Sequence, residues 1–190
     1  MNELVIKIDP ALYPAALAAW GLLLAACAYL AFSAVPERTA SWEKLPRGRI
    51  SGTVLMLIGI AWCAYQAVPV LDGMLPKEKI MLIALVCMVA GFFLLDNLFA
   101  RAIGGIMILT AHFMLDRSFD FHSPIKPLFS AACLVFGTAG IVICAKPYWL
   151  RDLVRKICQA PKWRMGAAAA AAAFSLVFLL ELILHFTSEK

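Results

Sequence analysis

The stretch that decides the fold is residues 80–115, IMLIALVCMVAGFFLLDNLFARAIGGIMILTAHFML, which is almost entirely apolar. As a single α-helix its 36 residues would extend about 54 Å, whereas the hydrocarbon core of a bilayer is about 30 Å thick. Asp96 and Asn97 interrupt the run near its middle, and both residue types favour turns over helix interiors. We therefore predict two membrane spans, 80–95 and 98–115, joined by a tight turn.

Composition places most of the side chains in lipid. The chain has 190 residues, of which 63% are apolar and 15% charged, and its mean hydropathy is +0.86. Soluble domains hold about 45–50% apolar and about 25% charged residues. We predict an all-α fold, a polytopic transmembrane helical bundle that forms a single integral membrane domain over 1–190. The formal net charge is +5, but the basic residues lie in short loops between apolar runs, so no nucleic-acid partner is expected.

Four further apolar runs are long enough to cross a bilayer, which takes about 20 helical residues. Together with the two halves of 80–115 they give about six spans: 11–35, 50–71, 80–95, 98–115, 128–145 and 165–186. Residues 1–10 mix acidic and basic side chains, unlike the basic start of a secretion signal. The first span is therefore expected to stay in the mature protein.

The distribution of basic residues favours six spans. Loops 36–50, 96–101 and 146–164 then share one side of the membrane and carry 11 Lys and Arg, against 6 on the other side. Cytoplasmic loops are enriched in these residues. A single crossing over 80–115 would nearly remove the imbalance. We expect a multi-pass protein of a cell (inner) membrane with both termini on the non-cytoplasmic side.

A short pattern repeats at the three predicted cytoplasmic turns, where an arginine is followed by a glycine as the next span begins. The three instances are Arg49-Ile-Ser-Gly52, Arg101-Ala-Ile-Gly104 and Arg164-Met-Gly166. The repeat indicates three helical hairpins in tandem, each closed by one of these turns. Duplication would explain it, and so would the general preference of arginine for cytoplasmic helix ends and of glycine for membrane helices.

Residues 148–159 form an amphipathic stretch between the last two spans. Leu150, Leu153, Val154 and Ile157 recur at helical spacing, while charged and amide side chains take the opposite face. We predict a short helix along the cytoplasmic interface, with its basic face against anionic lipid. A plain connector between two spans is compatible with the same pattern.

Small residues are concentrated in the last three spans. Gly104 and Gly105 lie in the fourth, Gly137 and Gly140 in the fifth, and seven alanines over 167–173 in the last. Small side chains let membrane helices approach closely, so we interpret these positions as packing sites. The six cysteines form no CxxC pair, and neither a disulfide framework nor a zinc site is predicted.

Polar residues near the predicted outer face supply a candidate site: His112, Asp116, His122, Glu181 and His185. Glu181 and His185 are four residues apart and share a helical face, as do His112 and Asp116. Such groups can bind a divalent metal or pass protons. The competing interpretation is interfacial polarity, because Glu181 would lie about 25 Å along its helix, where a carboxylate reaches water. No metal and no cofactor is assigned, haem included.

A second polar pair lies at the predicted cytoplasmic end. Asp96 and Arg101 flank the turn within 80–115. A local ion pair between them would ease the burial of that turn. No feature of the sequence supports a gating role for the pair.

Motifs of the common enzyme classes are absent. The sequence has no Gly-rich phosphate loop, no HExxH, no GxSxG and no Cys/His pair at nucleophile spacing. Few polar groups lie in mid-membrane, so the leading hypothesis is a non-catalytic accessory or scaffold component of a membrane complex, with a membrane-protein partner or self-association. The alternative is a small transporter or channel that moves protons, a cation or a small solute by way of Glu181, His112 and His185. An enzyme acting on a lipid or quinone ranks third.

Overall fold

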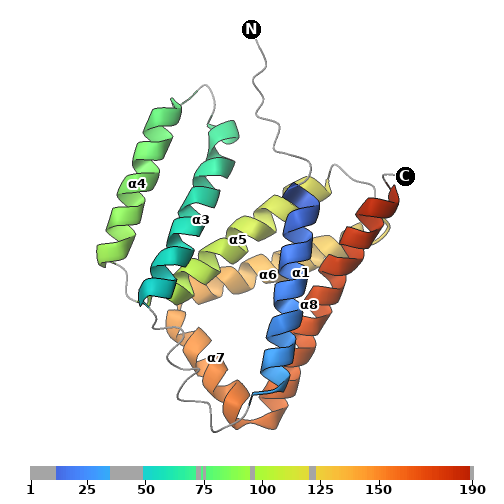
Figure 1. The fold of residues 1–190 in the computed structure, drawn as a ribbon. Coiled ribbons are helices and arrows are strands. Elements are labelled where there is room, and N and C mark those ends of the chain that lie inside the picture. The colour runs from blue at the N-terminus through green and yellow to red at the C-terminus, as the bar shows by residue number, and fades with distance from the viewer. Residues whose placement is uncertain are drawn as a thin grey trace.

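The structure of the protein, a computed structural model, describes residues 12–34, 49–71, 74, 76–94, 97–119 and 123–188. The described residues form seven α-helices and no strand, which confirms the predicted all-α class (Figure 1). The helices are α1 (Leu12–Phe32), α3 (Arg49–Val70), α4 (Lys77–Leu94), α5 (Leu98–Ser118), α6 (Lys126–Ala145), α7 (Pro147–Gln159) and α8 (Pro161–Ser188).

Five of these helices, α1, α3, α5, α6 and α8, are long and apolar enough to cross a membrane. Several apolar helices of this length are what a multi-pass membrane protein requires. Helix α4 has 18 residues and is apolar beyond its first turn, which holds Lys77, Glu78 and Lys79. The 80–115 stretch is divided as predicted, because α4 ends at Leu94 and α5 begins at Leu98.

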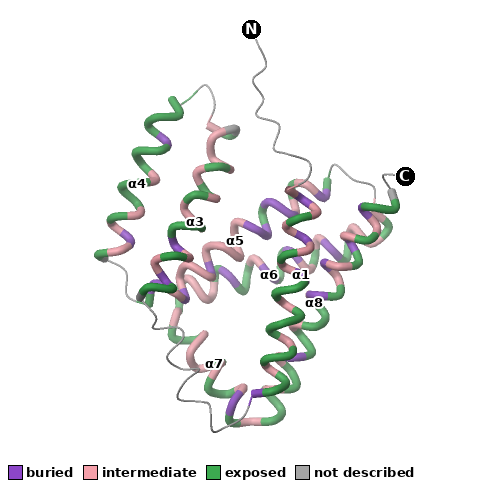
Figure 2. Tube along the Cα trace, in the orientation of Figure 1, coloured by how far each residue is buried: buried purple, intermediate pink, exposed green. Residues whose placement is uncertain are grey.

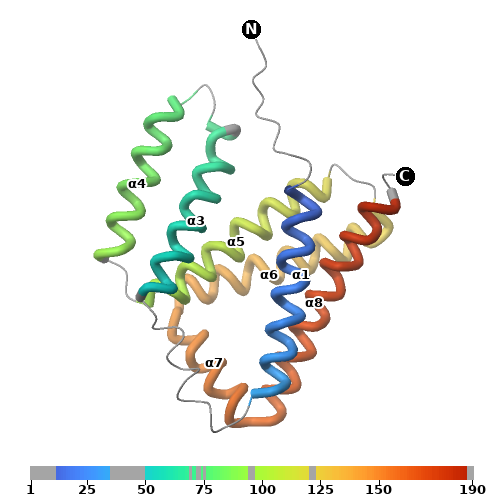
Figure 3. Tube along the Cα trace, in the orientation of Figure 1, coloured from blue at the N-terminus to red at the C-terminus, as the bar shows by residue number. Residues whose placement is uncertain are grey.

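Successive long helices alternate in direction. The start of α1, the ends of α3 and α5, and the end of α8 therefore lie at one end of the molecule, which we call the terminal end (Figures 1 and 3). The connections from α4 to α5 and from α6 through α7 to α8 lie at the opposite end, which we call the α7 end. This alternation places the start of α1 and the end of α8 at the same end of the molecule.

The helices pair as α1 with α8 and α5 with α6, while α3 packs chiefly on α5 and less extensively on α4. Three helical pairs were predicted, but their partners differ. The predicted hairpins, closed by turns 36–50, 96–101 and 146–164, would pair α1 with α3, α4 with α5, and α6 with α8. In the structure α3–α4 and α5–α6 are instead joined at the terminal end. Helix α1 packs against α8, the last helix of the sequence. The two most extensive pairings, α1–α8 and α5–α6, have small residues where the helices meet, and small residues permit close approach.

Glycines mark the closest helix crossings. A Cβ atom on Gly104 of α5 would lie 2.7 Å from the carbonyl oxygen of Gly140 in α6, and one on Gly140 would lie 2.8 Å from that of Gly104. A Cβ on Gly52 of α3 would lie 2.7 Å from the backbone nitrogen of Phe99. Gly166 has nothing within 4 Å. Of the glycines predicted to be packing sites, Gly104 and Gly140 lie at this crossing and Gly137 lies close to Ala111, whereas Gly105 has nothing within 4 Å.

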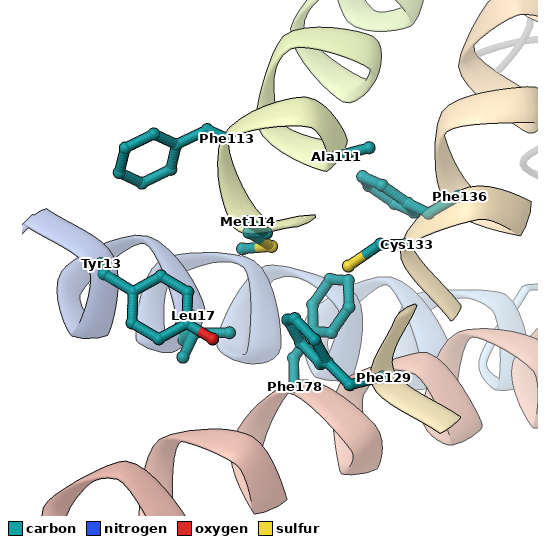
Figure 4. Close-up of a cluster of buried hydrophobic side chains, with 9 residues drawn as sticks. All are labelled: Tyr13, Leu17, Ala111, Phe113, Met114, Phe129, Cys133, Phe136 and Phe178. Atoms are coloured by element: carbon teal, nitrogen blue, oxygen red, sulfur yellow. The ribbon is translucent and has the colours of Figure 1, made fainter. Parts of the chain in front are cut away.

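The apolar core lies at the terminal end, where α1, α5, α6 and α8 meet (Figure 4). Its buried members are Tyr13, Leu17, Ala111, Phe113, Met114, Phe129, Cys133, Phe136 and Phe178. The Phe178 ring contacts those of Phe129 and Phe136, with centroids 5.8 and 5.7 Å apart. Burial falls away from this core, and α4 is mostly exposed (Figure 2).

The amphipathic stretch predicted over 148–159 is helix α7, which Pro147 begins from its first position. Proline suits that position because the first helical N–H has no partner within the helix. The helix packs against α6 and α8, and Cys158 is its buried residue. Its helical conformation is confirmed, and its location at a membrane interface stays a prediction.

Candidate functional site

Glu181 is the buried carboxyl group of the candidate site. It lies on α8 near the terminal end, and only 2% of its surface is exposed. The Ser123 hydroxyl, three residues before α6, donates a 2.8 Å hydrogen bond to its Oε2 atom. The Tyr13 hydroxyl, in the first turn of α1, donates a longer bond of 3.5 Å to Oε1. The expectation that this carboxylate reaches water is wrong, because α1 and the segment before α6 cover it.

His185 lies one turn beyond Glu181 and is also buried, with 7% of its surface exposed. Its ring lies against that of Tyr13, with centroids 5.4 Å apart. The Phe186 ring contacts it edge-on at 5.8 Å. Tyr13 thus touches both polar residues of α8, with its hydroxyl on Glu181 and its ring on His185. Figure 4 shows that Tyr13 projects from α1 beside Leu17 at the edge of the core.

The other predicted site residues lie elsewhere or outside the described residues. His112 and Asp116 are on α5 with exposed side chains, unlike the buried Glu181. His122 lies outside the described residues, and so does Asp96, the predicted partner of Arg101. Arg101 itself is half-buried near the start of α5. Within the described ranges, no group of three or more His, Cys, Asp or Glu side chains could hold a metal ion.

Comparison with known proteins gives no relative. No protein-family model matches the chain, and no curated protein and no solved structure is significantly similar to it. What the site does must therefore be argued from its geometry.

Sequence reasoning missed Tyr13 and Ser123, the two hydroxyl donors to Glu181. Tyr13 is 168 residues from Glu181 in sequence, and nothing local in either segment indicates the contact. One signal was available: a tyrosine in the first turn of a span has an apolar ring and a polar tip that seeks a partner. That signal predicts that the hydroxyl is satisfied but does not identify the acceptor.

Other polar groups, buried or half-buried, also connect one helix to another. The Trp20 indole nitrogen on α1 donates to the Thr110 hydroxyl on α5 at 3.1 Å. The Gln66 amide on α3 donates to the Leu109 carbonyl on α5 at 3.3 Å. The Ser175 hydroxyl on α8 donates to the Gly21 carbonyl on α1 at 2.7 Å. The Glu181 group resembles these contacts, since each is a hydrogen bond between helices.

Proposed function

We propose that the protein is a non-catalytic accessory or scaffold component of a membrane complex. The observation that carries the proposal is the use of its interior polar groups as bonds between helices. Glu181, Ser175, Trp20 and Gln66 each bond to a residue outside their own helix. Interhelical hydrogen bonds of this kind stabilise membrane bundles by about 0.6–2 kcal/mol each. A role in holding helices together accounts for these side chains without a path or a reaction.

Helix α4 is the element best placed to meet a membrane partner. It packs chiefly against α3 and lies at the periphery, away from the α1–α8 pair (Figure 1). Beyond the first turn its exposed side chains are mostly large and apolar, among them Leu82, Leu85 and Val89, which share one face. In this proposal the complex lies in a cell inner membrane with both termini on the non-cytoplasmic side.

Purification in mild detergent tests this proposal. We expect the wild-type protein to co-purify at fixed stoichiometry with another membrane protein or with a second copy of itself. A triple variant, L82A/L85A/V89A, should lose that partner. The matched control, L22A/L23A/L30A, removes exposed apolar side chains from α1 and should retain it. A wild-type protein that is monomeric and without a partner would refute the proposal.

Burial of Glu181 also favours a second candidate, a small proton or cation transporter. Ionisable side chains inside membrane spans are rare and often mark transport paths. Reconstituted wild-type protein would then conduct protons or a monovalent cation into liposomes, and Glu181→Gln would abolish the flux. Absence of flux for protons, Na⁺ and K⁺ in the wild type would remove this candidate and leave the scaffold role.

A further inference from the structure

A groove opens between α6 and α8 at the α7 end of the molecule. The largest part has a volume of about 770 Å³ and is walled by α6 residues from Leu134 to Ile143, with α7 as its floor. An adjoining part of about 590 Å³ is walled by α8 residues from Lys162 to Phe174. Val135, Ala139, Leu153 and Trp163 belong to both parts. We call the two together the α6–α8 groove.

The depth of the groove matches one leaflet of a membrane. On α8 its wall runs from Trp163 to Phe174, and on α6 from Leu134 to Ile143, short of the helix end at Ala145. The twelve helical residues from Trp163 to Phe174 extend about 18 Å, roughly half of a hydrocarbon core of about 30 Å. The wall residues along this depth are almost all apolar. A lipid acyl chain fits such a surface, whereas a transmembrane helix would need a face along the full thickness.

The rim of the groove at the α7 end is basic and aromatic. Lys156 of α7 and Lys162 of α8 both line it, beside Trp149 and Trp163. The Lys156 ammonium lies 5.0 Å from the centre of the Trp163 ring. Tryptophan and lysine together are typical of the headgroup level of a membrane protein.

One acidic residue, Asp152, lines the same rim. Its carboxylate lies 3.7 Å from the Arg151 guanidinium, which balances its charge. The two rim lysines therefore supply the net charge of the groove, and that charge is positive. An anionic group is the complement that this rim selects.

We propose that the α6–α8 groove binds an anionic phospholipid. An acyl chain lies between α6 and α8 against Val135, Ala139 and Ala170, and the phosphate lies at Lys156 and Lys162. The alanines of α8 leave room for the chain, because larger side chains would fill the wall. The bound lipid supports the ends of α6 and α8 where they are not in contact with each other. It is a site for one lipid molecule, separate from any general attraction of α7 to a charged surface.

Native mass spectrometry of the delipidated protein tests the headgroup contact, with phosphatidylglycerol and phosphatidylcholine of equal chain length as the probes. We expect one phosphatidylglycerol to be retained more tightly than phosphatidylcholine. The variant K156Q/K162Q should weaken phosphatidylglycerol retention on the order of 10- to 30-fold, since each basic residue near a lipid headgroup contributes about 1 kcal/mol. The control R155Q/K79Q removes two exposed charges outside the groove, one from α7 and one from the first turn of α4, and should change retention less than about 3-fold.

A second pair of variants tests the acyl-chain contact. Ala170→Leu fills the groove, whereas Ala169→Leu places the same side chain on the neighbouring exposed position outside it. We expect only the first to reduce phosphatidylglycerol retention, with both proteins folded by circular dichroism.

Equal loss of retention in K156Q/K162Q and in its control would reduce the effect to surface electrostatics and overturn the site. Equal retention of the two lipids, or no retained lipid, would overturn it as well.

Discussion

At the scale of single residues, the Glu181 carboxyl group shows how the terminal end is held together. It accepts hydrogen bonds from α1 through Tyr13 and from the segment before α6 through Ser123. Removing a donor from a buried carboxyl group lowers the free energy of unfolding by more than the net contribution of the bond, because the carboxyl group is then left unsatisfied and out of water. Ser123 should matter more than Tyr13, since its bond is short and that of Tyr13 is at the limit of hydrogen-bond length.

Ser123→Ala should therefore destabilise the protein by about 1–3 kcal/mol. For a chain of this length each kcal/mol lowers Tm by about 2–4 °C. Thermal unfolding in detergent, followed by circular dichroism, measures the change. The control is Ser33→Ala, which removes an exposed hydroxyl bonded to the Leu30 carbonyl one turn back. Equal Tm values for the two variants would show that the Glu181 bond does not stabilise the fold.

Asn97 is the described non-glycine residue with a positive φ, at 54° with ψ at 44°. This left-handed conformation costs most side chains about 1–2 kcal/mol but is tolerated by asparagine and free of strain for glycine. Asn97→Gly should leave Tm unchanged or slightly raised, and Asn97→Val should lower it. Comparison of both variants with the wild type in thermal unfolding checks the order. A valine variant as stable as the glycine variant would contradict it.

At the scale of elements, helix boundaries were predictable and helix partners were not. The span predicted over 98–115 is α5 (Leu98–Ser118), and the amphipathic stretch over 148–159 is α7 (Pro147–Gln159). Both depend on local sequence: hydropathy, helical period and turn residues. Pairing of α1 with α8 depends on surfaces at opposite ends of the chain, which one sequence does not reveal. The Tyr13–Glu181 contact was unpredictable for the same reason.

The α5–α6 crossing gives a prediction with a control in the adjacent residue. Gly104→Ala would place a methyl group 2.7 Å from the Gly140 carbonyl oxygen, a backbone atom that cannot rotate away. The helices must separate, and we expect a loss of about 1–3 kcal/mol. Gly105 has nothing within 4 Å, so Gly105→Ala should be neutral or stabilise by up to about 1 kcal/mol through helix propensity.

Thermal unfolding of the two variants side by side measures the difference between these glycines. Both changes add one methyl group to the same helix. Their effects on membrane insertion and on helix propensity are therefore equal and cancel in the comparison of the two Tm values. Gly104→Ala should have the lower Tm. If Gly105→Ala were equally destabilised, close approach of the backbones would not be what stabilises the α5–α6 pair.

At the scale of the whole molecule, the two ends differ in how the helices are held. The terminal end contains the aromatic core and the Glu181 bonds between α1, α8 and the start of α6. At the α7 end, the Arg164 guanidinium donates a 2.7 Å bond to the Ala34 carbonyl and so joins α8 to α1. There α6 and α8 are separated by the α6–α8 groove. One end is closed by protein, and the other has room for lipid.

The alternation of helix direction predicts that α4 crosses the membrane, which makes six crossings in all. Its start and the Asn97 turn that follows it would then lie on opposite sides.

In a variant without the native cysteines, Lys77→Cys should react with a membrane-impermeant maleimide added to intact cells. Asn97→Cys should react only after the membrane is permeabilised, because the 11 basic residues of its side favour the cytoplasm. Cysteine at exposed Lys162 should behave like Asn97→Cys. Labelling of Lys77→Cys and Asn97→Cys from the same side would mean that α4 does not span, which would contradict the alternating directions of the described helices.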